Sequence, residues 1–332
     1  MAQEALIQRL NLPLLISRES CAGGTYIVTG ANTGLGFEAA KHLVAIGAEK
    51  VIMGVRNLQA GQEAKAKIEA ATNIFGVADV WHLDLSSYDS VKAFAAKAVA
   101  QLSRIDALIE NAAVAPGQRI VAEGHVSAVT VNVLSTFLLA VLLLPKMSRS
   151  SQEHNILPHI VIVTSRVSFD FRADWDRIKG DPLAGIDEEL MPFKTYPLSK
   201  LLEVLVARHL SGILSVSRTG VVINLVCPGL CTTELDRTAP QTFRDDLAAR
   251  RAEYGRTAED GSRTLLHAAV AGEKSHGCLL HSCEIAEDAV PDWVTSEDGK
   301  LSQKRTWDIV AAELNAAAPG AVESFLNVQL HV

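Results

Sequence analysis

The chain has 332 residues, of which 48% are hydrophobic and 21% are charged. This composition excludes intrinsic disorder, since disordered chains combine few apolar residues with a high net charge. The formal net charge of −7 at pH 7 excludes a general attraction for nucleic acids or for anionic lipids. One basic cluster, formed by Arg250, Arg251 and Arg256, alternates with acidic residues, and we interpret it as the solvated face of a helix.

The five cysteines include no C-x-x-C pair. Their odd number and their spacing argue against a disulfide framework and against a structural zinc site. We therefore expect a reduced protein of the cytoplasm that binds no metal.

The most apolar window runs from Val131 to Met147, and Pro145 and Lys146 stand at its end. A membrane-spanning helix needs about 20 apolar residues, which is longer than this window. Residues 1–22 contain no charged segment followed by an apolar core, so they do not resemble a signal peptide. We expect a buried core helix and no membrane span.

Apolar runs of strand length alternate with helical patterns along most of the chain. The sequence predicts strands at 26–29, 51–55, 80–85, 107–109, 160–164 and 221–226, and helices at 35–46, 58–71, 87–102, 131–147 and from 196 onward. The predicted strands are apolar throughout, as is typical of a parallel sheet that is covered on both faces. The pattern therefore predicts the α/β class, with a doubly wound parallel sheet known as the Rossmann fold.

A glycine-rich turn joins the first predicted strand to the first predicted helix, with the sequence T-G-A-N-T-G-L-G at 29–36. Glycines let the backbone turn sharply and approach a phosphate, and the following helix N-terminus favours a pyrophosphate. The predicted contacts of a dinucleotide in this turn are Gly30, Asn32, Thr33, Gly34, Leu35 and Gly36. A tight turn without a ligand is the alternative.

This turn resembles the T-G-x-x-x-G-x-G motif of the short-chain dehydrogenase/reductase family, and further motifs follow in the family's order. They are Asp84-Leu85 at the end of the third strand, Asn111-Ala112-Ala113 where the family has Asn-Ala-Gly, Asn132, Ser165, Tyr196 and Lys200 as Y-x-x-x-K, and Pro228-Gly229 with Thr233. The resemblance covers residues 22–282 and implies a nicotinamide dinucleotide. It places Asp84, Leu85, residues 111–113, Tyr196, Lys200, Pro228, Gly229 and Thr233 at the cofactor.

The C-terminal part is similar to a narrower group, the retinol-dehydrogenase-like members that are common in fungi. Residues 256–264 and the region of Trp307 carry this similarity. The membrane anchor of many retinol dehydrogenases has no counterpart here, so a retinoid substrate is not predicted.

Three segments are expected along the chain. The β-α alternation is lost after Gly272, although a helix is predicted near 301–314. We predict an N-terminal extension at 1–21, an NADP-binding Rossmann domain with the catalytic site at 22–282, and an appendage at 283–332 that packs on the same domain.

The end of the second strand indicates which dinucleotide is preferred. An acidic residue at this position binds the ribose hydroxyls of NAD and repels a 2′-phosphate. The chain has Arg56 there instead, and a guanidinium suits a phosphate. The sequence therefore favours NADP(H), with a solvated surface arginine as the alternative.

Tyr196 and Lys200 are four residues apart, so a helix brings them to one face. A free tyrosine has a pKa of about 10, and a nearby ammonium together with the nicotinamide charge lowers it toward neutral pH. By resemblance, Lys200 also holds the nicotinamide ribose, Asn132 supports a water relay, and Ser165 binds the substrate oxygen. The alternatives are that Ser165 caps a turn and that Asn132 satisfies a buried backbone group.

These observations predict an NADPH-dependent oxidoreductase that acts on a lipophilic ketone, aldehyde or alcohol in specialised metabolism. Segments 166–195, which has four aromatic residues, and 230–255, expected to be a mobile lid, are predicted to form the pocket walls. A non-redox enzyme of the same fold (an epimerase, dehydratase or cyclase) and a non-catalytic dinucleotide sensor are the alternatives. The resemblance leaves a homo-oligomer open.

Overall fold

The computed structural model describes residues 8–329. Its main sheet has eight strands in the order β10-β9-β8-β7-β4-β1-β2-β3. The strands are β1 (Thr25–Thr29), β2 (Lys50–Val55), β3 (Ala78–His82), β4 (Ala107–Glu110), β7 (His159–Val163), β8 (Val222–Cys227), β9 (Leu279–His281) and β10 (Glu284–Ile285). Neighbours pair in parallel, apart from β10, which is antiparallel to β9. The predicted doubly wound α/β fold is therefore confirmed.

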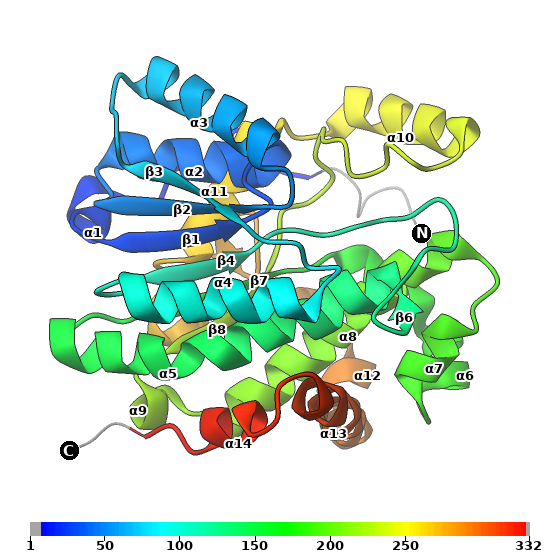
Figure 1. Ribbon diagram of the computed structural model, residues 1–332. Coiled ribbons are helices and arrows are strands. Elements are labelled where there is room, and N and C mark those ends of the chain that lie inside the picture. The colour runs from blue at the N-terminus through cyan, green and yellow to red at the C-terminus, as the bar shows by residue number, and fades with distance from the viewer. Residues whose placement is uncertain (1–7, 330–332) are drawn as a thin grey trace.

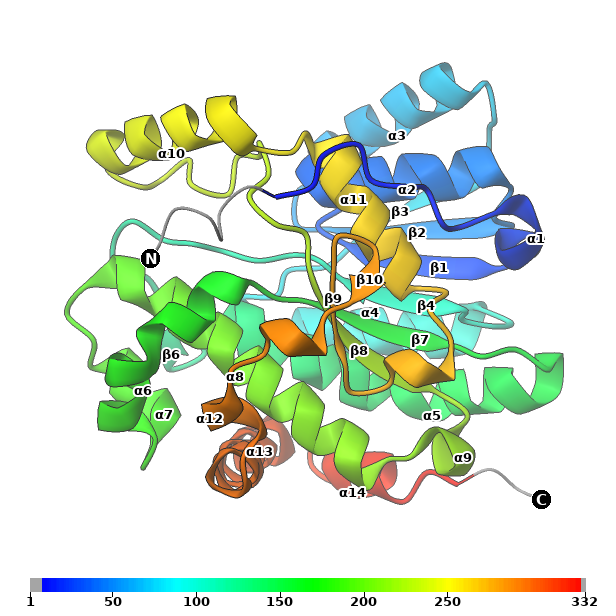
Figure 2. The same cartoon turned by 180° about the vertical axis from the view of Figure 1, so that it is seen from behind.

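Helices cover both faces of this sheet (Figures 1 and 2). One face carries α2 (Gly34–Ile46), α3 (Leu58–Thr72) and α11 (Ala258–Ala268), and the other carries α4 (Tyr88–Gln101), α5 (Thr136–His154) and α8 (Pro192–Ile213). Beyond the second face, α13 (Glu297–Ala317) packs on α8, and α14 (Ala321–Leu326) packs on α5.

The remaining elements are short, apart from α10, which has 14 residues. They are α1 (Arg18–Cys21), the hairpin of β5 (Val121–Ala122) and β6 (His125–Val126), the π-helical turn η2 (Val129–Ser135), η3 (Arg166–Phe171), α6 (Arg172–Ile178), α7 (Pro182–Asp187), α9 (Val216–Thr219), α10 (Gln241–Tyr254), η4 (Glu273–Ser275), η5 (Glu287–Ala289) and α12 (Asp292–Thr295). The hairpin, α6, α7 and α10 all lie toward one end of the sheet, on the right in Figure 1.

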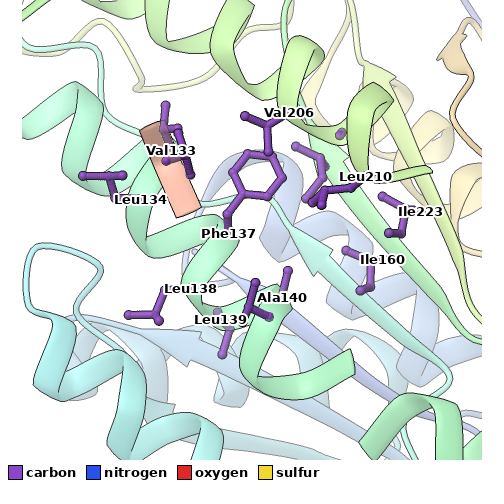
Figure 3. Packing of buried hydrophobic residues seen from close by; sticks show 14 of the residues in the cluster. Val133, Leu134, Phe137, Leu138, Leu139, Ala140, Ile160, Val206, Leu210 and Ile223 are labelled. Carbon is purple, nitrogen blue, oxygen red and sulfur yellow. The ribbon is translucent and has the colours of Figure 1, made fainter. Parts of the chain in front are cut away.

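The long apolar segment is a core helix, as predicted. Residues 129–154 are long and apolar enough to cross a bilayer, but 83% of their most apolar window is buried inside the protein. Figure 3 shows Phe137 of this helix among side chains of α5, the sheet and α8, with its ring near Val206. Pro145 does not end the helix, which continues to His154 and stops at Asn155 in the left-handed conformation.

Two expectations about local structure are wrong, and two strands were not anticipated. β3 ends at His82 rather than at residue 85, because the Asp84 carboxylate accepts hydrogen bonds from the Ser86 backbone N–H (2.9 Å) and hydroxyl (2.6 Å) and forms a turn. Strands β9 and β10 were not predicted, since runs of two or three residues carry no periodicity. Arg256 is not on a solvated face, for it is only 1% exposed.

The boundary at residue 282 stays a prediction, and the structure places short elements on both sides of it within one sheet. β10, at Glu284–Ile285, pairs with β9 inside the main sheet. Further along, Trp307 and Phe325 pack against each other and belong to the same hydrophobic core as Phe137. The last helices thus share the core of the preceding residues.

Truncation of Phe137 tests the core around η2, α5 and α8. Phe137→Ala should lower the free energy of unfolding by about 3–5 kcal/mol, because it removes a buried ring and leaves a cavity. Urea denaturation measures the change. Leu301→Ala on α13 is the control: its side chain is 64% exposed, so its loss should cost no more than about 0.5 kcal/mol. Equal effects of the two substitutions would contradict this account of the core.

Candidate active site

The candidate site residues gather where the parallel strands end at their carboxyl termini. The chain leaves β1 in one direction toward β2 and β3, and it leaves β4 in the other toward β7 and β8. β1 and β4 are neighbours, so a crevice opens between the segments that follow them. Such a switch point is where open α/β sheets bind ligands.

The glycine turn after β1 has the geometry that close approach to a phosphate requires. Gly30 (φ +67) and Gly34 (φ +59) adopt left-handed conformations that favour glycine. A Cβ on Gly36 would lie 2.5 Å from Asn111 Nδ2 and 2.7 Å from the Gly30 carbonyl oxygen, so the packing here leaves no room for a side chain. Asn32, Thr33 and Leu35 lie in the same turn, as predicted.

The segment after β4 is bonded directly to this turn. Asn111 Nδ2 donates to the Thr29 carbonyl oxygen (2.8 Å), and the backbone N–H groups of Asn111 (3.0 Å) and Ala112 (2.9 Å) donate to the Thr29 hydroxyl. Ala113 follows, partly exposed. These bonds fix two walls of the crevice relative to each other.

The N-terminus of α2 fits a pyrophosphate. Its N-cap residue, Thr33, makes no side-chain hydrogen bond to the first turn, so N–H groups and the positive end of the helix dipole stay available to an anion. Within 8–329, α2 contains no acidic residue in its first turn. The donor set of this turn therefore suits a dinucleotide phosphate.

Arg56, Asp84 and Leu85 follow the next two strands of the sheet. The Arg56 side chain is exposed directly after β2, and it makes no ion pair within the described part of the chain. Asp84 is held in its turn by Ser86, and Leu85 is buried. All three lie along the edge where the adenosine half of a dinucleotide would extend from the glycine turn.

Pro228, Gly229 and Thr233 follow β8 on the opposite side of the crevice. Gly229 has φ +83, a conformation that costs other residues about 1–2 kcal/mol. The Thr233 methyl group would lie 3.4 Å from a Cβ on Gly34. The segment after β8 thus reaches back over the glycine turn.

Ser165 and Tyr196 come together although 30 residues separate them in the sequence. A side-chain hydrogen bond joins them, and it acts to lower the pKa of the tyrosine. Two effects outweigh this hydrogen bond and raise the pKa of Tyr196 above its usual value. They are the burial of the ring and the negative charge of the nearby Glu203 carboxylate. The phenol is therefore protonated at neutral pH in this state of the protein.

Lys200 lies one helical turn from Tyr196 and is almost fully buried. Its Nζ donates to the Val163 carbonyl oxygen (2.7 Å) and to Glu203 Oε1 (2.7 Å), and it lies 5.8 Å from the centre of the Tyr196 ring. Burial raises the pKa of Glu203 to about 7, although Lys200 opposes the change. An ammonium offers three donors, so Lys200 keeps one beyond these two bonds.

Asn132 is fully buried in η2, a π-helical turn of the kind that is frequent at functional sites. Its Oδ1 accepts from the Val114 N–H (2.9 Å), and its Nδ2 donates to the Val114 carbonyl oxygen (3.0 Å) and to the Ser199 hydroxyl (2.9 Å). The Asn132 side chain thus joins the loop after β4 to helix α8. Its two bonds to Val114 agree with the alternative stated above, in which Asn132 satisfies a buried backbone group.

A cavity of about 370 Å³ opens near the start of α8, where Thr195, the residue before Tyr196, contributes to a lining made mostly of apolar atoms. Its walls are the loop at 116–120 and the segment 187–195, which includes Leu190 and Pro192. The first wall was not anticipated from the sequence, whereas the second lies within the predicted wall at 166–195. Segment 230–255, the other predicted wall, does not line this cavity.

The aromatic residues of segment 166–195 do not line this cavity. Trp175 is only 2% exposed and packs in the core, and Phe169 makes an edge contact with Trp293 at 6.5 Å between ring centres. Phe193 is 58% exposed. Two of the four aromatic residues therefore fasten the segment onto the domain.

Comparisons with known proteins identify the family. Residues 25–175 match the model of the short chain dehydrogenases. The chain is 42% identical over 313 residues to the short chain dehydrogenase/reductase dmxR8 of Cryptosporiopsis sp. (strain 8999), with 92% of this chain and 94% of that protein covered. The chain belongs to the short-chain dehydrogenase/reductase family.

A further relative agrees with this assignment, and a solved structure shows the same fold. The short-chain dehydrogenase/reductase ffsI of Aspergillus flavipes is 38% identical over 313 residues, covering 93% of this chain and 90% of that protein. A solved short chain dehydrogenase of Shigella flexneri, complexed with NADP, superposes with a TM-score of 0.60 at 19% identity, covering 81% of this chain and all of that one. The resemblance inferred from the motifs is confirmed, and the narrower retinol-dehydrogenase-like similarity stays a prediction.

Two carboxyl groups of the site were missed from the sequence. Glu203, three residues after Lys200, could have been found from helical spacing, because residues i and i+3 share a face. Glu110 ends β4, is fully buried, and has a pKa well above its usual value, chiefly through burial. Its sequence position carries no such signal, since it is the packing around β4 that buries it.

The geometry at Gly229 generates a test of the turn after β8. Gly229→Ala should lower the free energy of unfolding by about 1–3 kcal/mol, the usual cost of a strained backbone conformation. A Cβ at this position would also lie 2.2 Å from Gln8 Oε1, so the turn must shift and cofactor affinity should fall. Thermal unfolding and dinucleotide titration measure the two effects.

Gly212→Ala in α8 is the matched control. A Cβ there meets nothing within 4 Å, and alanine raises helix propensity by about 1 kcal/mol over glycine. This variant should be as stable as the parent or more stable. If Gly229→Ala behaved in the same way, the turn would not be constrained as described.

Proposed function

We propose that this member of the family is an NADP(H)-dependent oxidoreductase that interconverts a lipophilic ketone or aldehyde and the corresponding alcohol. One observation carries the proposal: Ser165, Tyr196 and Lys200 meet at the carboxyl edge of the sheet, beside a glycine turn that suits a dinucleotide. Acid–base groups at this position are what hydride transfer to a carbonyl requires.

The bound nicotinamide would supply the hydride in the reductive direction and accept it in the oxidative one. The Tyr196 hydroxyl then donates its proton to the carbonyl oxygen as negative charge develops there. The raised pKa of Tyr196 keeps this proton in place before the reaction. Ser165 hydrogen-bonds the same substrate oxygen and stabilises its charge.

Lys200 and Asn132 act behind these two residues. The remaining N–H of the Lys200 ammonium is available to a ribose hydroxyl of the cofactor, and its charge stabilises the Tyr196 phenolate after proton transfer. Asn132 holds the loop after β4 against α8, and in this proposal it also orders the path by which Tyr196 is reprotonated.

NADP(H) is the proposed cofactor because Arg56 follows β2 where an acidic residue would otherwise repel a 2′-phosphate. The exposed guanidinium can bind that phosphate through two parallel hydrogen bonds. The rest of the dinucleotide would be held by Gly30, residues 32–36, Asp84, Leu85, residues 111–113, Pro228, Gly229 and Thr233.

The substrate class rests on the cavity near the start of α8, which Thr195 lines one residue before Tyr196. Most of the lining atoms are apolar, as is usual for sites that bind small organic molecules, and Arg119, Asp187 and Glu189 are among the charged residues that add polar groups. We propose a bulky ketone or alcohol of specialised metabolism, such as a polyketide or terpenoid intermediate. A cytoplasmic location and a homo-oligomer remain predictions, and all five cysteines are free.

Absorbance at 340 nm tests the proposed activity directly. The protein should oxidise NADPH with lipophilic carbonyl compounds, and kcat/KM should rise with the size of the apolar substituent. Tyr196→Phe should lower kcat by at least about 10²-fold, the usual contribution of a general acid, while NADPH binding stays nearly unchanged.

Tyr88→Phe is the control for this substitution, because the buried Tyr88 hydroxyl has no hydrogen-bond partner. Its activity should equal that of the parent. Binding of NADPH without turnover would favour a dinucleotide sensor, and a product of unchanged oxidation state would favour a non-redox enzyme. Near-normal reduction by Tyr196→Phe would show that the proton comes from elsewhere.

Cofactor preference tests the role of Arg56. NADPH should bind at least about tenfold more tightly than NADH, a difference of about 1.4 kcal/mol. Arg56→Asp should abolish or invert this preference, since a carboxylate repels the 2′-phosphate. Titration of both dinucleotides gives the affinities, with Arg305→Asp, an exposed position on α13, as the control for charge alone. Equal affinities in the parent protein would remove Arg56 from this role.

A further inference from the structure

Gln8 makes an unusual set of contacts for a residue so near the start of the chain. Its Oε1 accepts from the Leu230 N–H (2.9 Å), and its Nε2 donates to the carbonyl oxygens of Leu230 (2.7 Å) and Tyr254 (2.8 Å). Leu230 and Tyr254 stand at the two ends of the segment 230–255. One side-chain amide thus binds both ends of this segment.

The same two ends are joined to each other by backbone hydrogen bonds. The Arg256 N–H donates to the Leu230 carbonyl oxygen (2.9 Å), and the Thr232 N–H donates to the Arg256 carbonyl oxygen (2.8 Å). The buried Arg256 guanidinium donates to the carbonyl oxygens of Pro228 (2.6 Å) and Arg9 (2.9 and 2.8 Å). These bonds join residues 228–232 to Arg256 at the base of the segment, and we call this base, residues 228–232 and 254–256, the hinge. The hinge is in turn bonded to the N-terminal residues Gln8 and Arg9.

Residues 8–12 are firmly attached to the domain. Leu12 is fully buried, and the N–H groups of Asn11 (3.0 Å) and Leu12 (2.6 Å) donate to the Asp260 carboxylate on α11. Figure 2 shows the N-terminal chain running across α11 toward α10. These contacts fix the position of the chain that carries Gln8 next to the hinge.

The segment held by this hinge lies over the proposed cofactor site. Near its start, Thr233 lies against Gly34 of the glycine turn. Further on, the Thr238 hydroxyl accepts from the Gly117 N–H (3.3 Å), in the loop that follows β4. The segment therefore contacts both walls of the crevice.

Apart from these contacts, little else holds the segment. Helix α10 has no buried residue, and it projects from the body of the protein in both ribbon views. Its attachment to the rest of the protein therefore depends on the Thr238 contact and on the two ends of the segment, where Gln8 binds.

We propose that Gln8 is a positioning residue of the cofactor site: its amide clamps the hinge of segment 230–255 and thereby limits how fast the dinucleotide dissociates. The part that concerns dissociation rests on the proposed NADP(H) function, whereas the clamp itself does not. In this proposal the N-terminal extension contributes to cofactor binding through Gln8.

Two substitutions separate the hydrogen bonds from packing. Gln8→Met keeps the length of the side chain but removes every donor and acceptor of the amide. Gln8→Glu keeps an acceptor for the Leu230 N–H and places a carboxylate against two carbonyl oxygens. Arg9→Ala is the control, because it removes an exposed ion pair with Glu284 (2.8 Å) and leaves the backbone carbonyl that Arg256 binds.

NADPH dissociation is measured by stopped-flow fluorescence. Both Gln8 variants should release NADPH about tenfold faster than the parent, a change of about 1.4 kcal/mol, which is the size of one or two net hydrogen bonds. KM for NADPH should rise while kcat does not fall, and Gln8→Glu should show the larger effect. Arg9→Ala should behave like the parent.

Limited chymotrypsin digestion without cofactor is the second measurement. Phe243 on α10 is 47% exposed, and cleavage after it should be faster in both Gln8 variants because the segment opens more often. Unchanged cleavage and dissociation in folded Gln8→Met, or equal changes in Arg9→Ala, would overturn the proposal. If the parent bound no NADPH, the proposed function would fail. The digestion would still show whether Gln8 holds the base of segment 230–255.

Discussion

The parallel pairing of β1 with β4, with Val28 opposite Ile109, is the contact on which the site depends. Because the chain winds outward in opposite directions from these two strands, the helices that follow them leave on opposite faces of the sheet. The segments between strand and helix then diverge and leave a crevice. Hydrogen bonds from Asn111 and Ala112 to Thr29 hold the two sides of this crevice at a fixed distance.

The charged side chains of Lys200 and Glu203 are buried next to Tyr196. Lys200 and Glu203 form an ion pair with side chains only 3% and 2% exposed, at 2.7 Å. Such a pair is costly to desolvate, so it is weak evidence for stability and better evidence for a chemical purpose. The negative charge of Glu203 also helps to raise the pKa of Tyr196 and so to keep its phenol protonated. The charge of an oxidised nicotinamide would shift that balance toward the phenolate.

The covering of the crevice depends on parts of the chain that are far apart. Segment 230–255 touches Gly34 on one side and Gly117 on the other, and its base is bonded to residues more than 200 positions away along the chain. Arg256, fully buried beside Pro228, connects this base with the N-terminal residues and with Ser282 near the sheet edge. The covering of the crevice is therefore linked to the packing of residues 8–12 and of Ser282.

The sequence by itself determined the features that depend on local pattern. Apolar runs identified six of the strands, the glycine turn was placed correctly at the N-terminus of α2, and four-residue spacing put Tyr196 and Lys200 on one helical face. These succeed because helix and strand periodicities act over a few residues. Only the tertiary structure decided that Arg256 is buried, that Glu110 lies beneath the site, and that Gln8 binds the hinge. Each of these depends on which distant segments the fold brings together, and burial, which changes the behaviour of charged and polar groups, is a property of that packing.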